Sequence, residues 1–566
     1  MEHKSANKIC QNCKKDFPIE SEDFKFYEKM GVNTPNLCRE CRAQLRHIFR
    51  NERNFYKRHC DLCGESIITI WSSNKDTPVY CVPCWWSDKW DPMSFGFSYE
   101  GKRPFFEQIG ELYKKVPKPS LVGARNIDCQ YVNYVADCKR CYMIVESSNN
   151  EDCIHCYWIQ KTKDCVDVSY THQIELSYEV DDCHDSYGLK YSRSCYNCTD
   201  SAFLLNCRGC TECLGCVNLR NKTNCIFNIE YDREEYKEKL EEFRLDTHTG
   251  VENFRKEFEK FSRKFPRKYA EIYMSVNTTG NYEVNVKNNR ACFHSYDAED
   301  CAYSCHVWRE AKDCMDCHTA GRTAERIYNS TNTGIQVSNC ICCHNCWSSN
   351  FVEYSFICPN GNHLFGCVAL KKGTHCILNK QYDKEEYEKI KTKIVDELKK
   401  ENKYGEFFPK EMTLFGYNET TAIEEFPLSK EESLKLGFKW EDTPRGIYGK
   451  ETKRWEEVPD SIKDVNFDVT AEIFVCTTCS KNYRIIQNEF LFYKKANIPL
   501  PRTCPDCRHE RRMQSRGSNK LWRRQCMCQN ESHDHAEKCP SEFETPYSPD
   551  LPDIIYCERC YQQEVY

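Results

Sequence analysis

The cysteines of this chain follow two regular spacings, which limit its possible folds more than any other feature. There are 43 cysteines in 566 residues. Near both ends they form C-x-x-C pairs, and in the middle they fall on every third residue. Thiols at this density are normally held by metal ions or disulfides, because free thiols oxidise and mispair. The sequence therefore predicts metal-dependent structure and says much less about biochemical role.

Composition favours several domains in a reducing compartment. A chain of this length is expected to form more than one domain, each with its own hydrophobic core. Its first residues lack the apolar stretch of a signal peptide, and no window is apolar enough for a transmembrane helix. We therefore expect a cytoplasmic protein whose C-x-x-C pairs bind metal or act in redox chemistry. The formal net charge of −6 means that any nucleic-acid surface must be local.

The two ends repeat each other. The spacing C-x2-C-x24-C-x2-C occurs near the start and again 466 residues later, with aromatic residues and a proline in the same register. Two C-x-x-C turns offer four thiolates to a tetrahedral Zn²⁺ and leave no position for water. Because structural zinc contributes roughly 10–16 kcal/mol in small domains, we expect metal to decide whether the ends fold. The predicted ligands are Cys10, Cys13, Cys38 and Cys41 at the front and Cys476, Cys479, Cys504 and Cys507 at the back.

Each end also carries a second predicted zinc site, which makes about four Zn²⁺ ions at the termini. At the front its ligands are Cys60, Cys63, Cys81 and Cys84. At the back, Cys539, Cys557 and Cys560 keep the spacing of the last three of these. The fourth ligand is displaced by an insertion, and Cys526, Cys528, His533 or His535 is available for it. We favour Cys526 or Cys528.

The terminal pattern resembles a known family. C-x-x-C, an F-x-F-Y aromatic patch and then P-x-x-C-x-x-C-R is similar to the pattern of the bacterial "probable zinc-ribbon" family, and the segment Glu489–Arg508 matches it closely. The front copy is looser. The resemblance implies zinc binding and a zinc-ribbon or treble-clef-like fold at each end, but it implies no activity.

A row of arginines follows the first site in each copy and predicts a helix there. Its members are Arg39, Arg42, Arg46 and Arg50 at the front and Arg508, Arg512 and Arg516 at the back. Their steps of three and four residues place them on one helical face. Guanidinium groups without interleaved acids suit phosphate contact. The alternative is an ordinary solvated face.

The central cysteines predict a solenoid. From Cys129 to Cys225, 14 cysteines all have numbers divisible by three. A helix or a strand would scatter these positions over several faces, whereas a coil that returns at fixed intervals keeps them together. The most frequent longer step is nine residues, which resembles nonapeptide-type β-solenoids.

A second cysteine block, from Cys292 to Cys376, repeats the first. A shift of 151 relates their final cysteines, and one residue inserted between Cys301 and Cys305 is expected to explain a change of frame. Each block ends in Asp-x-x-Glu before a charged amphipathic run, at Asp232 and at Asp383. This predicts a capped helix that covers the open end of each solenoid.

Two interpretations of the central thiols remain open. They form an inward ladder of small buried side chains, or some of them bind further metal ions. The candidates for additional metal binding are the pairs Cys138 and Cys141, Cys153 and Cys156, Cys195 and Cys198, Cys207 and Cys210, and Cys343 and Cys346. Similar cysteine-rich repeats occur in uncharacterised bacterial proteins that carry the terminal ribbons, a likeness that implies no function.

We therefore predict a multidomain, β-rich chain. Duplicated zinc-ribbon or treble-clef-like modules flank two tandem cysteine-rich β-solenoid-like repeats joined by helical connectors. The expected segments are a double zinc-ribbon module (1–98), a repeat module with its capping helix (121–245), a helical connector (246–290), a second repeat module with its capping helix (291–400), a linker with a short helix over Ser429–Leu436 (401–470) and a second double zinc-ribbon module (471–566).

The sequence favours a non-enzymatic role. It contains no P-loop, no G-x-S-x-G and no H-E-x-x-H, although a site assembled in space leaves no such motif. We expect a zinc-binding scaffold that docks on RNA, the ribosome or another nucleic acid through the arginine rows. The alternatives are a pure protein–protein interaction module and a metal-storage or redox protein that uses the central thiols. No membrane partner and no small-molecule substrate are indicated.

Overall fold

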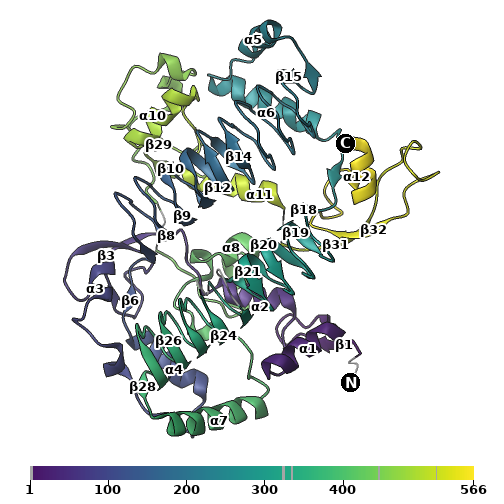
Figure 1. Ribbon diagram of the computed structural model, residues 1–566. Helices are drawn as coiled ribbons and strands as arrows, with labels where there is room; N and C mark the ends of the chain where they lie inside the picture. The colour runs from purple at the N-terminus through teal and green to yellow at the C-terminus, as the bar shows by residue number, and fades with distance from the viewer. Residues whose placement is uncertain (1–3, 321–324, 333–335, 444–445, 518) are drawn as a thin grey trace.

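Two stacks of parallel coils form the centre of the molecule, and the terminal modules pack against them (Figure 1). The computed structural model describes residues 4–320, 325–332, 336–443, 446–517 and 519–566. We call the first stack solenoid 1 (residues 123–226) and the second solenoid 2 (residues 272–377). No helix in these described ranges combines the length and the apolar character needed to cross a bilayer. The predicted β-rich architecture with a central solenoid is confirmed.

Each coil of solenoid 1 contains 12 residues, because Cys153 pairs with Cys165 and Tyr178 with Lys190 in parallel register. Every third residue has a left-handed backbone, as at Asp137 (φ 57°) and Arg140 (φ 52°). The residue after each such corner points inward, as Cys138 does. The coil is thus four-sided with one inward residue per side, which produces the period of three. The nonapeptide interpretation is wrong, since nine residues are three sides of the coil.

Left-handed corners are costly for residues other than glycine, by about 1–2 kcal/mol each. The ladder between coils fixes them. The corner N–H of Asp182 donates to Ser169 O at 3.1 Å, and the N–H of the preceding Asp181 donates to Ser192 O at 3.0 Å. Because this pattern repeats along the stack, backbone groups pair with the coils on both sides and the corners have no alternative conformation that keeps these bonds.

Solenoid 1 begins with short strands and continues as a ladder of single bridges with the same register up to Ile226. Its strands are β7 (Gly123–Ala124), β8 (Asn133–Ala136), β9 (Val145–Ser148), β10 (Glu151–Ile154), β11 (Tyr157–Gln160), β12 (Lys163–Glu175), β13 (Tyr178–Asp181) and β14 (His184–Tyr187). It ends in the hairpin of β15 (Cys225–Ile226) and β16 (Ile229–Glu230), followed by α5 (Arg233–Glu242) and α6 (His248–Ser262). Asp232 caps α5 as predicted, since its carboxylate accepts from Glu235 N at 2.9 Å.

Solenoid 2 begins inside the segment expected to be a connector (246–290). Only α6 fills the helical part of that segment, and β18 and β19 already belong to the second sheet. The strands are β18 (Ile272–Tyr273), β19 (Gly280–Val284), β20 (Cys292–Glu299), β21 (Cys305–Lys312), β22 (His318–Ala320), β23 (Glu325–Tyr328), β24 (Ser338–Ile341), β25 (Asn350–Glu353), β26 (Gly361–Phe365), β27 (Gly373–Ile377) and β28 (Lys380–Gln381). Asp383 caps the following helix α7 (Lys384–Lys400), again as predicted.

Some coils of solenoid 2 are one residue longer. Tyr296 pairs with the residue 12 positions later, but Ala298 pairs with Ala311, 13 positions later. The extra residue therefore shifts the three-residue spacing of the inward positions after Cys305. The expected insertion between Cys301 and Cys305 is wrong. Ser304 takes the inward position that follows Cys301, while Cys305 lies outside the thiol core. Without a view of the corners, the sequence could not show which residue was extra.

The terminal modules share one local plan: a hairpin carrying a C-x-x-C turn, then a helix, then a second C-x-x-C pair that begins the next helix. The N-terminal module (residues 4–98) and the segment after it contain β1 (Ala6–Ile9), β2 (Asp16–Ile19), α1 (Ser21–Met30), α2 (Arg39–His47), β3 (Tyr56–His59), β4 (Ser66–Thr69), β5 (Val79–Tyr80), α3 (Val82–Trp86), η1 (Pro92–Phe95), α4 (Phe105–Lys115) and β6 (Lys118–Pro119).

The C-terminal module (residues 471–566) repeats this plan so closely that α1 and α10 coincide residue for residue under the shift of 466. It contains β29 (Phe474–Val475), β30 (Asn482–Tyr483), α10 (Gln487–Ala496), α11 (Pro505–Arg516), β31 (Trp522–Gln525), β32 (Glu542–Thr545), β33 (Ile555–Tyr556) and α12 (Glu558–Val565). β33 pairs in parallel with β17 (Arg267–Lys268), just before solenoid 2.

The linker at 401–470 has little regular structure. Its elements are η2 (Lys410–Met412), η3 (Tyr417–Glu419), α8 (Ala422–Glu425), α9 (Lys430–Lys435), η4 (Trp455–Glu457) and η5 (Ile462–Asp464). The predicted short helix is confirmed as α9, with Ser429 and Glu432 forming its capping box. Gly437 follows it with a left-handed backbone (φ 78°), as a helix-terminating glycine does.

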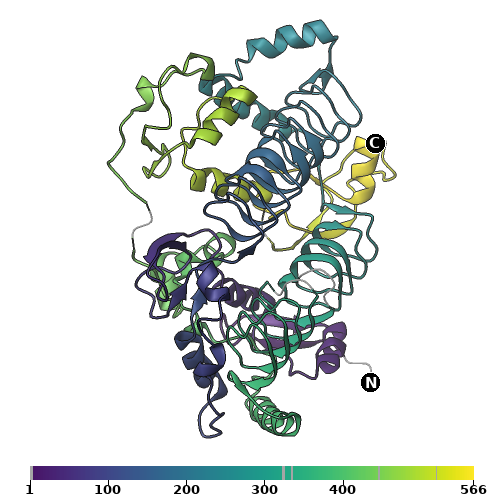
Figure 2. The same cartoon turned by 60° about the vertical axis from the view of Figure 1, so that its left-hand side comes forward.

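Side chains at coil corners join the two solenoids, which lie side by side in both views (Figures 1 and 2). Trp158 and Tyr170 of solenoid 1 stack with His294 and His306 of solenoid 2, and Tyr282 extends the stack on His294 within solenoid 2. The ring centroids of Trp158 and His306 are 4.2 Å apart, and those of Tyr170 and His294 are 4.9 Å apart. Because the same corner recurs every 12 residues in successive coils, each solenoid presents a ladder of rings, and the two ladders interleave.

Candidate metal centres

Four groups of cysteines, two in each terminal module, can each hold a metal ion. In every group the four sulfur atoms lie within 4.8 Å of one another. The groups are Cys10, Cys13, Cys38 and Cys41; Cys60, Cys63, Cys81 and Cys84; Cys476, Cys479, Cys504 and Cys507; and Cys526, Cys539, Cys557 and Cys560. The structure thus brings together the predicted ligands and selects Cys526, not Cys528, as the displaced fourth member of the last group.

Each group is built in the same way. In three groups the first two cysteines lie on a tight turn between two short strands, and in the last group Cys526 and Cys539 lie at the two ends of a longer connection between β31 and β32; in all four the third cysteine is the N-cap of a helix that carries the fourth. The N–H of the third cysteine donates to the first sulfur: Cys38 to Cys10 at 3.3 Å, and Cys504 to Cys476 at 3.2 Å. The same bond recurs at 3.2 Å in the other two groups.

These backbone bonds favour the thiolate form that metal binding requires. Burial opposes ionisation of Cys10, but hydrogen bonds from the backbone of Cys38 and Cys13 lower its pKa to about 7. In the second front group, burial again opposes ionisation, and the backbone bonds of Cys81 and Cys63 lower the pKa of Cys60 to about 6. The helix N-terminus behind the second pair adds a favourable field.

The insertion in the last group carries a further set of potential ligands. Cys528, His533 and His535 lie with Cys560 in a fifth group, whose ligand atoms are also within 4.8 Å of one another. Cys560 therefore belongs to two groups at once. The sequence offered these residues only as alternatives for one position, because spacing alone cannot show that two sites share a sulfur.

The central cysteines form a ladder of buried thiols. Many of the sulfurs donate to the backbone carbonyl two residues earlier, and several also to the carbonyl nine residues later, three sides further along the coil, as Cys207 does to Leu205 O (3.6 Å) and Cys216 O (3.4 Å). Within the described part of the chain, every potential metal group lies in the terminal modules. The candidates for additional metal binding belong to none of these groups and lie in buried clusters, which favours the interpretation as packed thiols; they are Cys138, Cys141, Cys153, Cys156, Cys195, Cys198, Cys207, Cys210, Cys343 and Cys346.

The arginine rows are also placed differently from the expectation. They are buried against the solenoids and so do not form a face for phosphate; the buried members are Arg42, Arg46, Arg50, Arg508, Arg512 and Arg516. Arg39 stays partly exposed, with 39% of its side chain accessible, and pairs with Glu40 at 2.7 Å. The front helix ends at His47, so Arg50 lies beyond it.

The buried front arginines reach both solenoids. Arg42 donates through Nε and Nη2 to the two carboxylate oxygens of Asp316, at 2.6 and 3.0 Å. Arg46 donates to Asn329 Oδ1 at 2.9 Å. Arg50 instead lies over the ring of Tyr134 in solenoid 1, 4.3 Å from its centroid.

The buried back arginines repeat this arrangement on the other solenoid. Arg508 Nε donates to Asp167 at 2.6 Å, and Arg512 Nη1 to the second oxygen of the same carboxylate at 3.1 Å. Arg516 pairs with Asp181 of solenoid 1 at 2.8 Å and also reaches His294 of solenoid 2, which lies 3.0 Å away across the interface between the two solenoids. Asp167 and Asp316, which sequence analysis did not identify, lie at left-handed corners of their coils.

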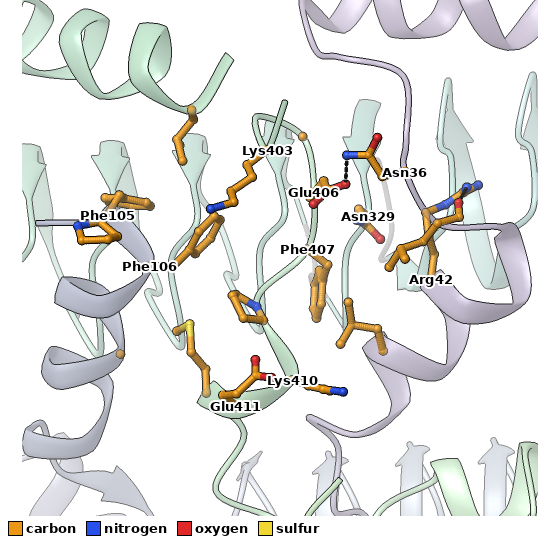
Figure 3. A pocket seen from close by; sticks show the side chains of 18 of the residues that line it. Asn36, Arg42, Phe105, Phe106, Asn329, Lys403, Glu406, Phe407, Lys410 and Glu411 are labelled. Atoms are coloured by element: carbon orange, nitrogen blue, oxygen red, sulfur yellow. Dashed lines mark hydrogen bonds between the residues drawn. The ribbon is translucent and has the colours of Figure 1, made fainter. Parts of the chain in front are cut away.

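A cavity of about 730 Å³ adjoins the first cysteine group, between α2, α4 and the segment after α7 (Figure 3). Aromatic rings such as Phe407 and long charged side chains line it, and Asn36 donates to Glu406 across one edge at 2.6 Å. The Asn12 amide, another lining group, donates to Cys41 Sγ at 3.3 Å. Among the described lining residues, Cys41 alone belongs to a potential metal group.

Comparison of the chain with protein-family models, with curated proteins and with solved structures finds no match. The zinc-ribbon resemblance of the two ends therefore stays a prediction, and any function has to be argued from the geometry above.

Proposed function

We propose that this chain is a zinc-binding, non-enzymatic scaffold whose terminal modules clasp the two solenoids into one body. One observation carries the proposal. In each of the four closed four-cysteine groups, the last two cysteines lie at the start of a helix, and the first of these helices in each module carries arginines that are buried against the solenoids. A closed set of four thiolates leaves no open coordination position, so its role is structural.

The sulfur geometry suits zinc. A tetrahedral Zn²⁺ with bonds of about 2.3 Å requires sulfur atoms about 3.8 Å apart. Cys479 and Cys504 are 3.7 Å apart, and Cys63 and Cys81 are 3.9 Å apart. Thiolate ligands in this arrangement favour zinc over magnesium or calcium, which prefer oxygen.

The arginine rows explain why metal and scaffold would be coupled. Cys41 and Arg42 are neighbours on α2, and Cys507 and Arg508 are neighbours on α11. A metal ion that fixes the start of the helix therefore also fixes the guanidinium that enters the solenoid. Loss of the ion would therefore disrupt both the local fold of the module and the buried ion pair between the arginine and its aspartate.

A protein partner suits this scaffold better than RNA or the ribosome. Apart from Arg39, the arginines that suggested phosphate contact are engaged inside the molecule. The long outer faces of the solenoids present regular rows of side chains, the kind of extended surface that repeat proteins use to bind other proteins.

Native mass spectrometry with elemental analysis of the reduced full chain tests whether zinc is bound. Small-angle scattering before and after chelation tests whether the terminal modules hold the two solenoids together. We expect at least four zinc ions, a larger radius of gyration after their removal and recovery on adding Zn²⁺. Cys479→Ser should lose one ion, whereas Cys342→Ser, a buried cysteine outside the groups, should lose none. A chain without zinc, or one whose size is unchanged after complete removal, contradicts the proposal. Binding of a partner that survives nuclease and high salt separates a protein from a nucleic acid.

A further inference from the structure

The last cysteine group differs from its front counterpart by an insertion rich in metal ligands. The two cysteines of its first pair, Cys526 and Cys539, are separated by ten residues more than Cys60 and Cys63. The inserted stretch carries one cysteine and two histidines, all three of which fold back to the group. An insertion needed only for chain length would have no reason to return three ligand side chains to a metal group.

The inserted side chains converge on one point. Cys528 Sγ lies 3.1 Å from Nδ1 of His533, and Nε2 of His535 lies 3.4 Å from Sγ of Cys560. Cys528 is completely buried and His533 is 7% exposed. A tetrahedral zinc ion with bonds of about 2.3 Å to sulfur and about 2.0–2.1 Å to nitrogen holds these atoms about 3.5 Å apart, so the contact of His535 with Cys560 matches this spacing and that of His533 with Cys528 is shorter.

The far side of each imidazole has a partner that suits metal binding. His535 Nδ1 lies 2.5 Å from the backbone oxygen of Glu537, and His533 Nε2 lies 3.5 Å from a carboxylate oxygen of Glu564. Metal-bound histidines generally donate their second ring N–H to a carbonyl or carboxylate, which orients the ring and fixes the tautomer. For His535 this leaves the lone pair on Nε2, which faces Cys560, whereas His533 Nε2 has the Asn530 amide nitrogen at 3.3 Å as well as the Glu564 carboxylate at 3.5 Å.

We propose that a second zinc ion binds Cys528, His533, His535 and Cys560, and that the Cys560 thiolate bridges it to the ion of the neighbouring four-cysteine group. This inference rests on the proposed zinc binding of that group. The second ion would have two sulfur and two nitrogen ligands, a common tetrahedral zinc set. A thiolate has lone pairs for two ions, and five thiolates with two Zn²⁺ carry a net charge of −1, against −2 for a single ion with four thiolates. The centre is thus binuclear, while the front module keeps two separate ions.

Counting ions in the full chain tests the proposal. After reconstitution with Zn²⁺ under reducing conditions, we expect five ions per chain by native mass spectrometry. The double variant His533→Asn/His535→Asn should hold four, and so should Cys528→Ser. The control His59→Asn changes a front-module histidine next to Cys60 that lies outside every potential metal group, and it should still hold five.

Cadmium reports the bridge directly. With ¹¹³Cd²⁺ in place of zinc, the wild type should give five resonances, two of which couple through the shared sulfur. The histidine variants should lose one resonance and shift its coupled partner, leaving the other three in place. Four ions in the wild type overturn the binuclear centre while leaving the proposed function intact. Five ions that survive the histidine and cysteine variants also overturn it, and a chain with no zinc overturns both.

Discussion

The guanidinium of Arg508 lies 2.6 Å from the carboxylate of Asp167, and neither side chain is accessible to solvent. Its counterpart Arg42, 466 residues earlier, is 2.6 Å from Asp316 in the other solenoid. Each arginine also donates to the carbonyl five residues before it, Leu37 O at 2.7 Å and Thr503 O at 2.8 Å. The duplication has therefore preserved a docking contact as well as a set of metal ligands.

Breaking this pair should be costly. Asp167→Asn keeps the shape of the side chain but leaves the buried guanidinium of Arg512 without its counter-charge and that of Arg508 with Glu489, 3.1 Å away, as its remaining one. A buried charge deprived of its partner costs about 3–5 kcal/mol. We expect a loss of this size in the apparent free energy of unfolding, measured by urea denaturation, together with faster proteolysis of α11.

A matched control is Glu542→Gln, whose partner Arg523 lies 2.6 Å away with 79% of its side chain exposed. Surface pairs of this kind contribute about 0–1 kcal/mol. Equal effects of the two substitutions would mean that the Arg508 contact does not hold the C-terminal module in place.

Metal removal should unfold the ends before the centre. The four-cysteine groups hold modules with small cores, whereas the solenoids are stabilised by their ladders and by buried thiols. After chelation, limited proteolysis should cut first within 4–98 and 471–566, and circular dichroism should retain the β signal of the coils. Terminal segments that stay resistant after complete loss of metal would contradict this order.

The sequence predicts what local chemistry determines. The ligands of three groups, and three of the four in the last group, follow from spacing because a C-x-x-C turn is a local structure, and the caps at Asp232 and Asp383 follow for the same reason. The arginine partners are not predictable in this way: Asp316 lies 274 residues from Arg42 and becomes a partner only when a coil corner places it there. The 12-residue coil was hidden for a related reason, since the inward residue of every side shows the period of three but not the number of sides.

The thiol ladder predicts that central cysteines tolerate serine. Ser192 already occupies an inward position, where its hydroxyl donates to Lys190 O at 2.8 Å just as Cys207 donates to Leu205 O. Cys207→Ser should therefore change the stability by about 1 kcal/mol and leave the zinc content unchanged. Cys207→Leu adds volume to a completely buried site and should cost about 1–3 kcal/mol. Loss of a metal ion in Cys207→Ser, measured by native mass spectrometry, would return the central thiols to the list of ligands.

A carboxyl group inside solenoid 2 should make stability depend on pH. Glu283 points into the coil, where it accepts hydrogen bonds from Asn289 Nδ2 at 3.0 Å and from Ser295 N at 3.2 Å. Burial raises its pKa to about 8, and these hydrogen bonds oppose the shift only in part. Between the ordinary carboxyl range and pH 8 the folded chain keeps a proton that the unfolded chain has released. The unfolded state then binds fewer protons, so stability falls as the pH rises through this window.

Glu283→Gln removes the titrating group but keeps an oxygen that can accept these hydrogen bonds. Its urea midpoint should vary less with pH than that of the wild type, and it should be the more stable protein at pH 8, while the two converge near pH 4. Glu299→Gln is the control on the same solenoid: Glu299 is partly exposed, and hydrogen bonds from Lys287 and Lys312 lower its pKa, so its removal should have a small effect of opposite sign. A Glu283→Gln protein that is less stable than the wild type at pH 8 would show that the carboxylate is ionised and paired inside the coil, contrary to its surroundings.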